Sequence, residues 1–223
     1  MDRRLCIAVD GPASSGKGTV ARLVAKKLGY SYIDTGAMYR SVAFFAHQQG
    51  IEWGDAKALA RMVENLQFDF TWNGEELDVI VDGRNITQNI RREQIGNGAS
   101  VVGTHPEVRL ALLERQRDFA QKGGVVMDGR DIGTVVLPDA DLKIFLDASA
   151  SERARRRHAE LQGKGSSEDF ETVLAGVNSR DEQDRNRTEA PLRQASDAVY
   201  IDTTGMSANE AALTILKIAA DLA

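Results

Sequence analysis

The sequence predicts an α/β protein of three layers, in which helices cover a five-stranded parallel sheet. Short apolar runs rich in β-branched residues alternate with helical patterns, as expected where a crossover helix follows each parallel strand. Five of these runs end in an aspartate: 5–10, 30–34, 125–128, 142–147 and 198–202. Ligands bind outside the carboxyl ends of parallel strands, so a site is expected along the sheet edge where these aspartates gather.

The segments between the strands have helical patterns with recognisable ends. In 18–28 the apolar residues fall on one face, and Gly29 is suited to cap the C-terminal end. Pro106 is placed to be the first residue of its helix, and a final helix is expected to begin at the capping box formed by Ser207 and Glu210. The remaining helices are expected over 37–49, 55–65 and 106–122.

Two segments interrupt the alternation. Residues 66–87 contain two alternating runs separated by Asn73-Gly74, which predicts a β-hairpin outside the parallel sheet. Residues 149–193 are strongly charged and helical in pattern, with the connection "QGKGSS" at 162–167. The expected organisation is a core of 1–34, 100–148 and 194–223, an insertion over 35–99, and a helical lid over 149–193.

Composition limits the function classes. The chain has 223 residues, 42% of them hydrophobic, and a net charge of −5, so no global field draws it to nucleic acid or to an anionic membrane. Cys6 is the only cysteine, which excludes an internal disulfide and suits a reducing compartment. The apolar run 5–9 is too short for a signal peptide or a membrane span. We therefore expect a cytoplasmic protein without nucleic-acid or membrane partners.

The most specific motif is "GPASSGKGT", which follows the first predicted strand and opens the first predicted helix. Gly-x4-Gly-Lys is the Walker A pattern, in which backbone N–H groups wrap phosphate oxygens and Lys17 reaches the terminal phosphates. The strict pattern has Ser or Thr at position 18, whereas this chain has Gly18 and places the hydroxyl at Thr19. The motif comprises Gly11, Pro12, Ala13, Ser14, Ser15, Gly16, Lys17, Gly18 and Thr19.

Two shorter motifs suggest other enzyme classes. Asp34-Thr35-Gly36 matches the catalytic triplet of retroviral aspartic proteases, but that class needs β-rich surroundings, which the α/β alternation contradicts. Asp202-Thr203-Thr204-Gly205 resembles a GTPase switch, yet the chain lacks the guanine-reading Asn-Lys-x-Asp. A three-letter match such as Asp-Thr-Gly is expected by chance in about one of twenty chains of this length, and Asp202-Thr203-Thr204-Gly205 follows the last predicted strand, with only one helix left. We therefore interpret both matches as coincidental.

A nucleotide phosphate site with Mg²⁺ usually has a carboxylate at the end of a neighbouring strand. Asp128, in "VVMDGRD", follows the apolar run 125–127 and is the candidate to hold magnesium, directly or through water. Arg130 follows closely and is placed to bridge phosphates. The similar Asp82-Gly83-Arg84 lies in the predicted hairpin and is interpreted as a surface turn.

Arginines are dispersed over several segments, as expected where two nucleotides bring many negative charges together. Arg180, Asp184 and Arg187 have helical i, i+4, i+7 spacing, which fits either a solvated ion-pair stripe or a lid that closes over a site. The basic run "SERARRRH" at 151–158 suggests RNA binding, but in an acidic chain an ATP-side lid is the better interpretation, with Arg153 and Arg157 as its candidates.

Taken together, these segments resemble bacterial cytidylate kinases over about 4–202, nearly the whole chain. The motifs that carry the resemblance are "GPASSGKGT", "DTGAMYR", "NGAS" before "PEVRLALLERQR", "MDGRDIGTVVLPDADLKIFLDAS" and "SRDEQDRNRTEAPL". The resemblance implies a monomeric P-loop kinase that uses MgATP to phosphorylate CMP or dCMP. The Gly18-Thr19 form is also seen in adenylate kinase and its relatives. A P-loop kinase for another acceptor, and a nucleotide-sensing protein without transfer activity, remain the alternatives.

The resemblance also implies roles for individual residues. Lys17, Asp128, Arg130 and Arg187 are expected to serve catalysis, with magnesium at Asp128 and Thr19. The hairpin 66–87 resembles the extra β element of the monophosphate-binding domain in the bacterial enzymes. The residues implied around CMP are Thr35, Arg40, Ser100, Arg109, Arg130, Asp131, Arg180, Asp184 and Arg187. Cytosine presents an amino donor and two acceptors, to which Asp131, Ser100 and Arg109 are chemically matched.

Overall fold

The computed structural model describes residues 4–73 and 76–222. The chain divides into two compact units. The first contains the described residues up to Tyr32 together with those from Lys122 onward, and the second is Ile33–Gln121. The second unit is therefore one uninterrupted stretch of chain, inserted between two segments that build the first.

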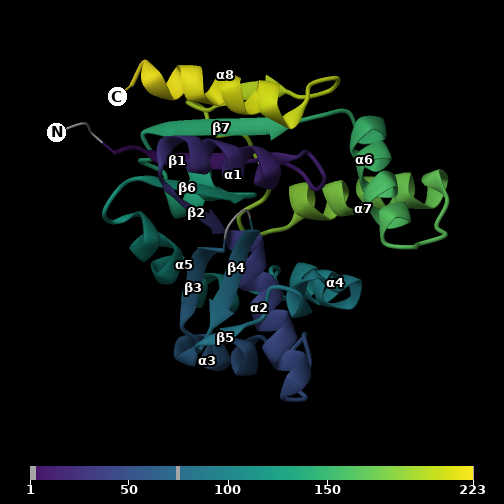
Figure 1. Ribbon diagram of the computed structural model, residues 1–223. Coiled ribbons are helices and arrows are strands. Elements are labelled where there is room, and N and C mark those ends of the chain that lie inside the picture. Colours follow the sequence, from purple (N-terminus) through teal and green to yellow (C-terminus); the bar gives the residue numbers. More distant parts are fainter. Residues whose placement is uncertain (1–3, 74–75, 223) are drawn as a thin grey trace. The chain divides into compact units, whose positions relative to one another are not determined.

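The five-stranded sheet confirms the predicted fold class (Figure 1). Its strand order is β2-β6-β1-β7-β8. The strands are β1 (Cys6–Asp10), β2 (Ser31–Asp34), β6 (Val125–Gly129), β7 (Leu142–Asp147) and β8 (Val199–Asp202). β1 pairs in parallel with both β6 and β7, with Ile7 opposite Val126 on one side and Leu142 on the other. Ile7, Ala8 and Val9 of β1 are fully buried, as expected for a central parallel strand.

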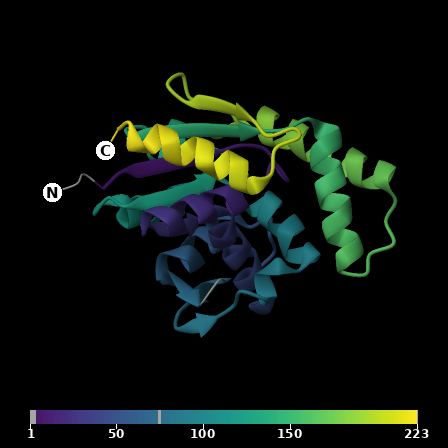
Figure 2. The same ribbon diagram turned by 45° about the horizontal axis from the view of Figure 1, so that its top comes forward.

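Helices of the first unit pack on each other in two pairs. α1 (Lys17–Leu28) packs against α8 (Ala208–Ala220), and α8 begins with the predicted capping box. Figure 2 shows α8 in yellow along the sheet. α6 (Ala150–Gly163) packs against α7 (Phe170–Asn186) through a small apolar cluster. Among the described residues, each helix is too short or too polar to span a bilayer.

The second unit has its own apolar core, to which Met38, Val42, Leu59 and Leu112 belong. Its helices are α2 (Thr35–Gln48), α3 (Ala56–Asn65), η1 (Asn89–Arg91), α4 (Glu93–Val102) and α5 (Pro106–Ala120). α2 packs against α4, and α3 packs against α5. The insertion expected over 35–99 lies within this unit, and 100–121 belong to it as well. α5 is included because its buried side chains complete the core built by the helices before it.

The predicted hairpin is present in the second unit. β3 (Phe68–Asn73) and β4 (Glu76–Val81) pair antiparallel, and Gly74 of the expected turn lies outside the described residues. Asp82 and Gly83 connect β4 to β5 (Arg84–Asn85) and both have positive φ, at 50° and 74°. This conformation is that of a tight hairpin turn, which confirms the interpretation of Asp82-Gly83.

Candidate active site

The loop Gly11–Thr19 joins β1 to α1 along an unusual backbone path. Ser14 has a φ of 58° and Gly16 a φ of 86°, both in the left-handed region. In the described part of the chain, no side chain caps the first turn of α1. Uncapped N–H groups at a helix start bind phosphate oxygens readily. The loop therefore has the backbone expected of a phosphate-binding site.

Two side-chain positions fit the same interpretation. A Cβ on Gly11 would lie 2.0 Å from the carbonyl oxygen of Leu146, so only glycine permits this approach of the loop to β7. The Ser15 hydroxyl is buried and has no hydrogen-bond partner among the described residues. A buried polar group without a partner is costly, and a phosphate oxygen at the loop would satisfy it.

Lys17 is the buried cation of the site. Its side chain is 8% exposed, and Nζ donates a hydrogen bond to the carbonyl oxygen of Pro12 over 3.0 Å. The pKa of Lys17 is lowered to about 7, mainly by burial and next by the nearby Arg130, while Asp128 opposes the shift. A bound phosphate would favour the charged ammonium, so the position is suited to an anionic ligand.

Asp128 lies in β6 and is 5% exposed. The Tyr32 hydroxyl, on the neighbouring strand β2, donates to Asp128 Oδ1 over 2.7 Å. A Cβ on Gly18 would come within 3.3 Å of the Tyr32 oxygen and 3.6 Å of Asp128 Oδ2. The departure from the strict Walker A pattern at position 18 therefore has a physical reason, because glycine leaves room for the tyrosine beside the carboxylate.

Oxygen donors suited to magnesium are available here. Asp128 supplies a carboxylate, and Thr19, an exposed residue in the first turn of α1, supplies a hydroxyl. Within 4–73 and 76–222, no group of three or more His, Cys, Asp or Glu side chains is placed to hold a metal by itself. Mg²⁺ commonly binds through one or two carboxylates together with substrate phosphates and waters. The donor set therefore fits a magnesium ion that arrives with a nucleotide.

Arg130 and Asp184 join the segment after β6 to α7. Arg130 Nε lies 2.7 Å from Asp184 Oδ2, and both side chains are largely buried. Burial opposes the ionisation of Asp184, but Arg130, Arg180 and Arg187 together outweigh it and hold the pKa of that carboxyl below its ordinary value. Arg130, Arg180 and Asp184 also act electrostatically on Lys17. These four predicted residues therefore form one charged cluster.

Arg187 lies just beyond the end of α7, with extended backbone at φ −62° and ψ 140°. The expected helical stripe is therefore correct for Arg180 and Asp184 but wrong for Arg187. Its Nη2 lies 3.5 Å from Oδ1 of Asp131, and its Nε donates to the carbonyl oxygen of Ala190 over 2.6 Å. The structure thus brings Arg187 to the segment that follows β6, by a route that helical spacing does not predict.

Asp10 ends the first of the five predicted strands, and the sequence assigns it no individual role. Its carboxylate accepts hydrogen bonds from the backbone N–H groups of Ile132, at 2.8 Å, and Gly133, at 2.7 Å. These residues start the π-helix Ile132–Val136, directly after Asp131. Burial raises the pKa of Asp10 to about 7, although the two N–H groups oppose the shift. Asp10 therefore holds in place the segment that carries Asp131.

Two arginines of α6 reach the loop. Arg153 Nη1 donates to the carbonyl oxygen of Ala13 over 3.2 Å, and Arg156 Nη1 donates to that of Ser15 over 3.1 Å. Both contacts are to carbonyl oxygens rather than to the N–H groups that would face phosphate. The two arginines therefore hold the loop through its carbonyl oxygens.

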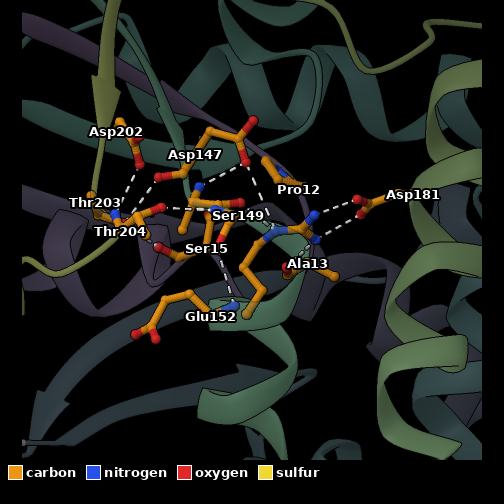
Figure 3. A network of polar contacts seen from close by, with 12 residues as sticks. Pro12, Ala13, Ser15, Asp147, Ser149, Glu152, Asp181, Asp202, Thr203 and Thr204 are labelled. Atoms are coloured by element: carbon orange, nitrogen blue, oxygen red, sulfur yellow. Dashed lines mark hydrogen bonds and ion pairs between the residues drawn. The ribbon is translucent and has the colours of Figure 1, made fainter. Parts of the chain in front are cut away.

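Arg157 pairs with Glu160 of its own helix, with 3.0 Å between Nη1 and Oε2. Arg156, which sequence reasoning does not assign, also donates to the carbonyl oxygen of Thr203 over 2.7 Å. Thr203 lies beside the loop, on the turn after β8 (Figure 3). The sequence spacing does not show whether Arg156 or Arg157 acts together with Arg153, because residues three and four positions later both lie on the same helical face.

In the second unit, the Asp-Thr-Gly triplet starts a helix. Asp34 caps α2 by accepting from the N–H of Ala37 over 2.8 Å, and its other oxygen accepts from Arg40 over 2.7 Å. A Cβ on Gly36 would lie 3.1 Å from Asp34 Oδ1 and 3.2 Å from Arg40 Nη1. Thr35 is the buried first residue of α2. The triplet therefore positions Arg40, and the protease interpretation has no support.

Ser100 and Arg109 lie on α4 and α5 of the same unit. The Ser100 hydroxyl donates to the carbonyl oxygen of Gly96 over 3.3 Å. Arg109 Nη1 donates to that of Gly103 over 3.3 Å, and its guanidinium lies 5.6 Å from the ring centre of Tyr39 on α2. Arg109 is thereby held beside the helix that begins with the Asp-Thr-Gly triplet.

Comparison with known proteins gives consistent matches over the chain. A model of the cytidylate kinase family matches residues 7–221. A cytidylate kinase of Listeria monocytogenes is 48% identical over 219 residues, which cover 98% of this chain and 97% of that protein. One from Aeromonas salmonicida is 46% identical over 213 residues, covering 96% and 93%. One from Exiguobacterium sp. is 51% identical over 207 residues, covering 93% and 92%.

A solved structure supports the fold. A crystal structure of an uncharacterized protein from Eubacterium ventriosum matches with a TM-score of 0.54 and 14% sequence identity. The match covers 97% of this chain and 98% of that one. At this identity the likeness concerns the fold alone.

Proposed function

The chain belongs to the cytidylate kinase family and phosphorylates CMP with ATP, and we propose that it also accepts dCMP and transfers the γ-phosphoryl group directly, in line, between the two nucleotides. The observation that carries this proposal is the buried Lys17, which sits at an uncapped helix start beside Arg130 and Asp128. Direct transfer needs positioned charge rather than a covalent intermediate, and this cluster supplies it.

We assign the ATP phosphates to Gly11–Thr19. The uncapped N–H groups of α1 and the buried Ser15 hydroxyl support this assignment. In the proposed mechanism, Lys17 leaves the Pro12 carbonyl and stabilises negative charge on the transferred group. Arg130 and Arg187 share this role from the acceptor side. The lid over 149–193 would close over ATP and exclude water, with Arg153 and Arg157 on its ATP side.

We assign the acceptor to the residues that the family resemblance implies. Arg40, Arg130 and Arg187 suit the phosphate of CMP, since guanidinium groups bind phosphate oxygens in pairs. Asp184, with Arg180, suits the ribose hydroxyls. Asp131, Ser100 and Arg109 suit the edge of cytosine, and Thr35 completes the set. The insertion over 35–99, with its hairpin, would serve as the monophosphate-binding domain, and 1–34, 100–148 and 194–223 as the core.

Magnesium is the cofactor that the donor set fits. When bound with ATP it would neutralise charge on the phosphates. Asp128 would hold it, with Thr19 as a second oxygen donor, either directly or through water. Tyr32 would orient Asp128 by the hydrogen bond described above. We further propose that the protein acts as a cytoplasmic monomer and binds neither nucleic acid nor membranes.

An ADP-release assay tests the proposal. Purified protein would be given MgATP with CMP, dCMP, UMP, AMP, GMP or shikimate in separate reactions. Turnover confined to CMP and dCMP is the expected result. Faster turnover with another acceptor would replace the cytosine assignment, and ATP binding without ADP formation would favour a nucleotide sensor. Positional-isotope or stereochemical analysis of a chiral γ-thiophosphate would separate direct transfer, with inversion, from a two-step route.

A further inference from the structure

α7 is attached to the rest of the first unit by acidic side chains. Near its start, Val173 and Val177 pack with α6. Towards its end, Asp181 and Asp184 each accept hydrogen bonds from an arginine outside α7. A cavity of about 620 Å³ extends beside the helix. Its lining includes Asn178, Asp181 and Arg185 of α7 and Asp147, Tyr200 and Asp202 of β7 and β8. Because of this cavity, α7 is not clamped against the edge strands by close packing.

Arg153 is the partner of Asp181 and joins three segments. The two side chains are 2% and 7% exposed. Arg153 Nη1 and Nη2 donate to the two carboxylate oxygens of Asp181 at 2.9 Å and 2.5 Å, a bidentate pair. Nε donates to the carbonyl oxygen of Ala148 over 2.9 Å, and Nη1 also donates to that of Ala13. A buried pair holds its geometry closely when further donors are satisfied, as Nε and the second N–H of Nη1 are here.

The third of these segments is the phosphate loop. Pro12 and Ala13 present consecutive carbonyl oxygens, and the first accepts from Lys17 Nζ while the second accepts from Arg153. The next residue, Ser14, has its φ at 58°, a conformation that costs free energy and is retained where surrounding contacts enforce it. When Lys17 turns to a phosphate, the Pro12 carbonyl oxygen loses the hydrogen bond that Lys17 Nζ donates to it. A change in the peptide between Pro12 and Ala13 is passed to the next peptide, whose Ala13 carbonyl oxygen accepts from Arg153.

From these contacts we infer that Arg153 is a positioning residue that couples the phosphate loop to α7, so that ATP and CMP bind with positive cooperativity. The inference rests on the proposed function, in which α7 and its end supply Asp184 and Arg187 to the acceptor. When ATP phosphates occupy the loop, the position of Arg153 is fixed, and its hydrogen bonds in turn fix the position of Asp181. Asp184 lies one turn later on the same face of α7, so its position is fixed as well. The second nucleotide then meets a helix that is already ordered, which lowers the entropic cost of its binding.

Arg153 therefore acts through protein groups rather than through ATP. All of its described contacts are to carbonyl and carboxylate oxygens of the chain. Coupling of this kind is reciprocal: CMP must raise the affinity for the ATP analogue by the same factor as the analogue raises the affinity for CMP.

Isothermal titration calorimetry measures the coupling without turnover. The dissociation constant of CMP would be determined with and without a saturating non-hydrolysable MgATP analogue. In the unmodified protein we expect the analogue to tighten CMP binding about 5-fold or more, within the usual range of coupling between sites. Asp181→Asn, which removes the charge but keeps the shape, should reduce this factor to less than about 2-fold.

A second variant addresses the objection that a lone buried Arg153 destabilises the fold. Arg153→Met with Asp181→Leu removes both charges together, and a buried ion pair exchanged for apolar side chains of similar size is commonly well tolerated. This double variant should unfold at a temperature close to that of the unmodified protein and still show no coupling. Arg155→Ala and Glu182→Gln are the matched controls, because both side chains are exposed neighbours on α6 and α7. Each should keep the full coupling.

Hydrogen exchange gives an independent readout. The MgATP analogue alone should protect the amides of 180–186 in the unmodified protein and leave them unchanged in the double variant. Equal CMP affinity with and without the analogue in an enzyme that phosphorylates CMP would overturn the coupling alone. Full coupling in the folded double variant would overturn the role of Arg153. Absence of CMP phosphorylation would instead refute the proposed function.

Discussion

The Tyr32 hydroxyl donates to Asp128 across 2.7 Å, from the strand next to the one that carries the carboxylate. Gly18 faces both groups, and a Cβ there would crowd the tyrosine. The hydroxyl that the strict Walker A pattern supplies at position 18 is therefore absent, and a tyrosine hydroxyl from another strand occupies the space beside the carboxylate.

Tyr32→Phe should raise the magnesium concentration needed for half-maximal activity by about 10-fold to 100-fold, the usual effect of removing a group that orients a metal ligand. The measurement is a magnesium titration of turnover at saturating nucleotides. Tyr200→Phe is the control, since Tyr200 is half exposed at the edge strand β8. An unchanged titration in a well-folded Tyr32→Phe variant would contradict the role of Tyr32.

Lys17→Ala should lower turnover by roughly 10³-fold or more, since it removes the buried cation from the phosphate loop. The circular dichroism spectrum should not change, because the Pro12 carbonyl that Lys17 contacts can bind water instead. Lys27→Ala removes an exposed lysine from the same helix and should have normal activity. Near-normal turnover of Lys17→Ala would remove this lysine from the chemistry.

Asp131→Asn should lower kcat/KM for CMP by about 10-fold to 100-fold, the usual range when a hydrogen bond to a charged group is lost. The carboxylate would no longer balance Arg187 or accept from the cytosine amino group with full charge. The KM for ATP should change little. Steady-state kinetics with each nucleotide varied separately make the measurement, and Asp139→Asn, at an exposed position before β7, is the matched control.

Asp10 predicts a specific pH dependence of stability. Burial raises the pKa of Asp10 to about 7 from the ordinary 3.8. Between these two pH values, the folded chain therefore keeps a proton on Asp10 that the unfolded chain has released. Its contribution to stability is therefore complete below about pH 4 and is lost as pH rises to about 7. Relative to Asp10→Asn, the unmodified protein should lose on the order of 4 kcal/mol of unfolding free energy over this window. Urea unfolding at a series of pH values measures the difference, and parallel curves would refute it.

Ser207→Ala should lower the free energy of unfolding by about 1 kcal/mol, since it removes the N-cap of α8. Ser207 Oγ accepts from the N–H of Glu210, and the Glu210 carboxylate accepts from the N–H of Ser207. Glu210→Gln keeps an acceptor at the same place and should cost less. The measurement is the thermal unfolding of the three proteins. Equal stability of all three would show that the capping box contributes nothing to the free energy of unfolding.

The strands and the loop are predictable from sequence because each has a local signal. β1, β6 and β7 are apolar runs that end at or beside an aspartate, and the observed bounds differ from the expected ones by one residue at most. Lys17 and the glycines around it follow from a motif whose backbone geometry requires them. Fold class and phosphate loop are therefore properties of short stretches of sequence.

Contacts between distant segments cannot be predicted from such local sequence signals. Asp10 and Asp131 are far apart in the chain, and only the pairing of β1 with β6 brings the Asp10 carboxylate to Ile132 and Gly133. The sequence predicts that Tyr32 lies in a strand. The group that its hydroxyl contacts depends on the order of the strands in the sheet. The helical stripe fails at Arg187 because α7 ends one residue earlier, where a change from helical to extended backbone redirects the side chain.

The inserted position of Ile33–Gln121 affects how the protein emerges from the ribosome. β1 is synthesised before its partners β6 and β7, which begin about 120 and 135 residues later. At usual elongation rates, roughly 6 to 27 s pass between the synthesis of β1 and that of these partner strands. During this time the inserted unit can fold from contacts within its own stretch, while a nascent strand of buried-type residues stays without hydrogen-bond partners. The newly made chain should therefore depend on chaperones that hold exposed apolar strands, and a circular permutant that begins after the insertion should depend on them less.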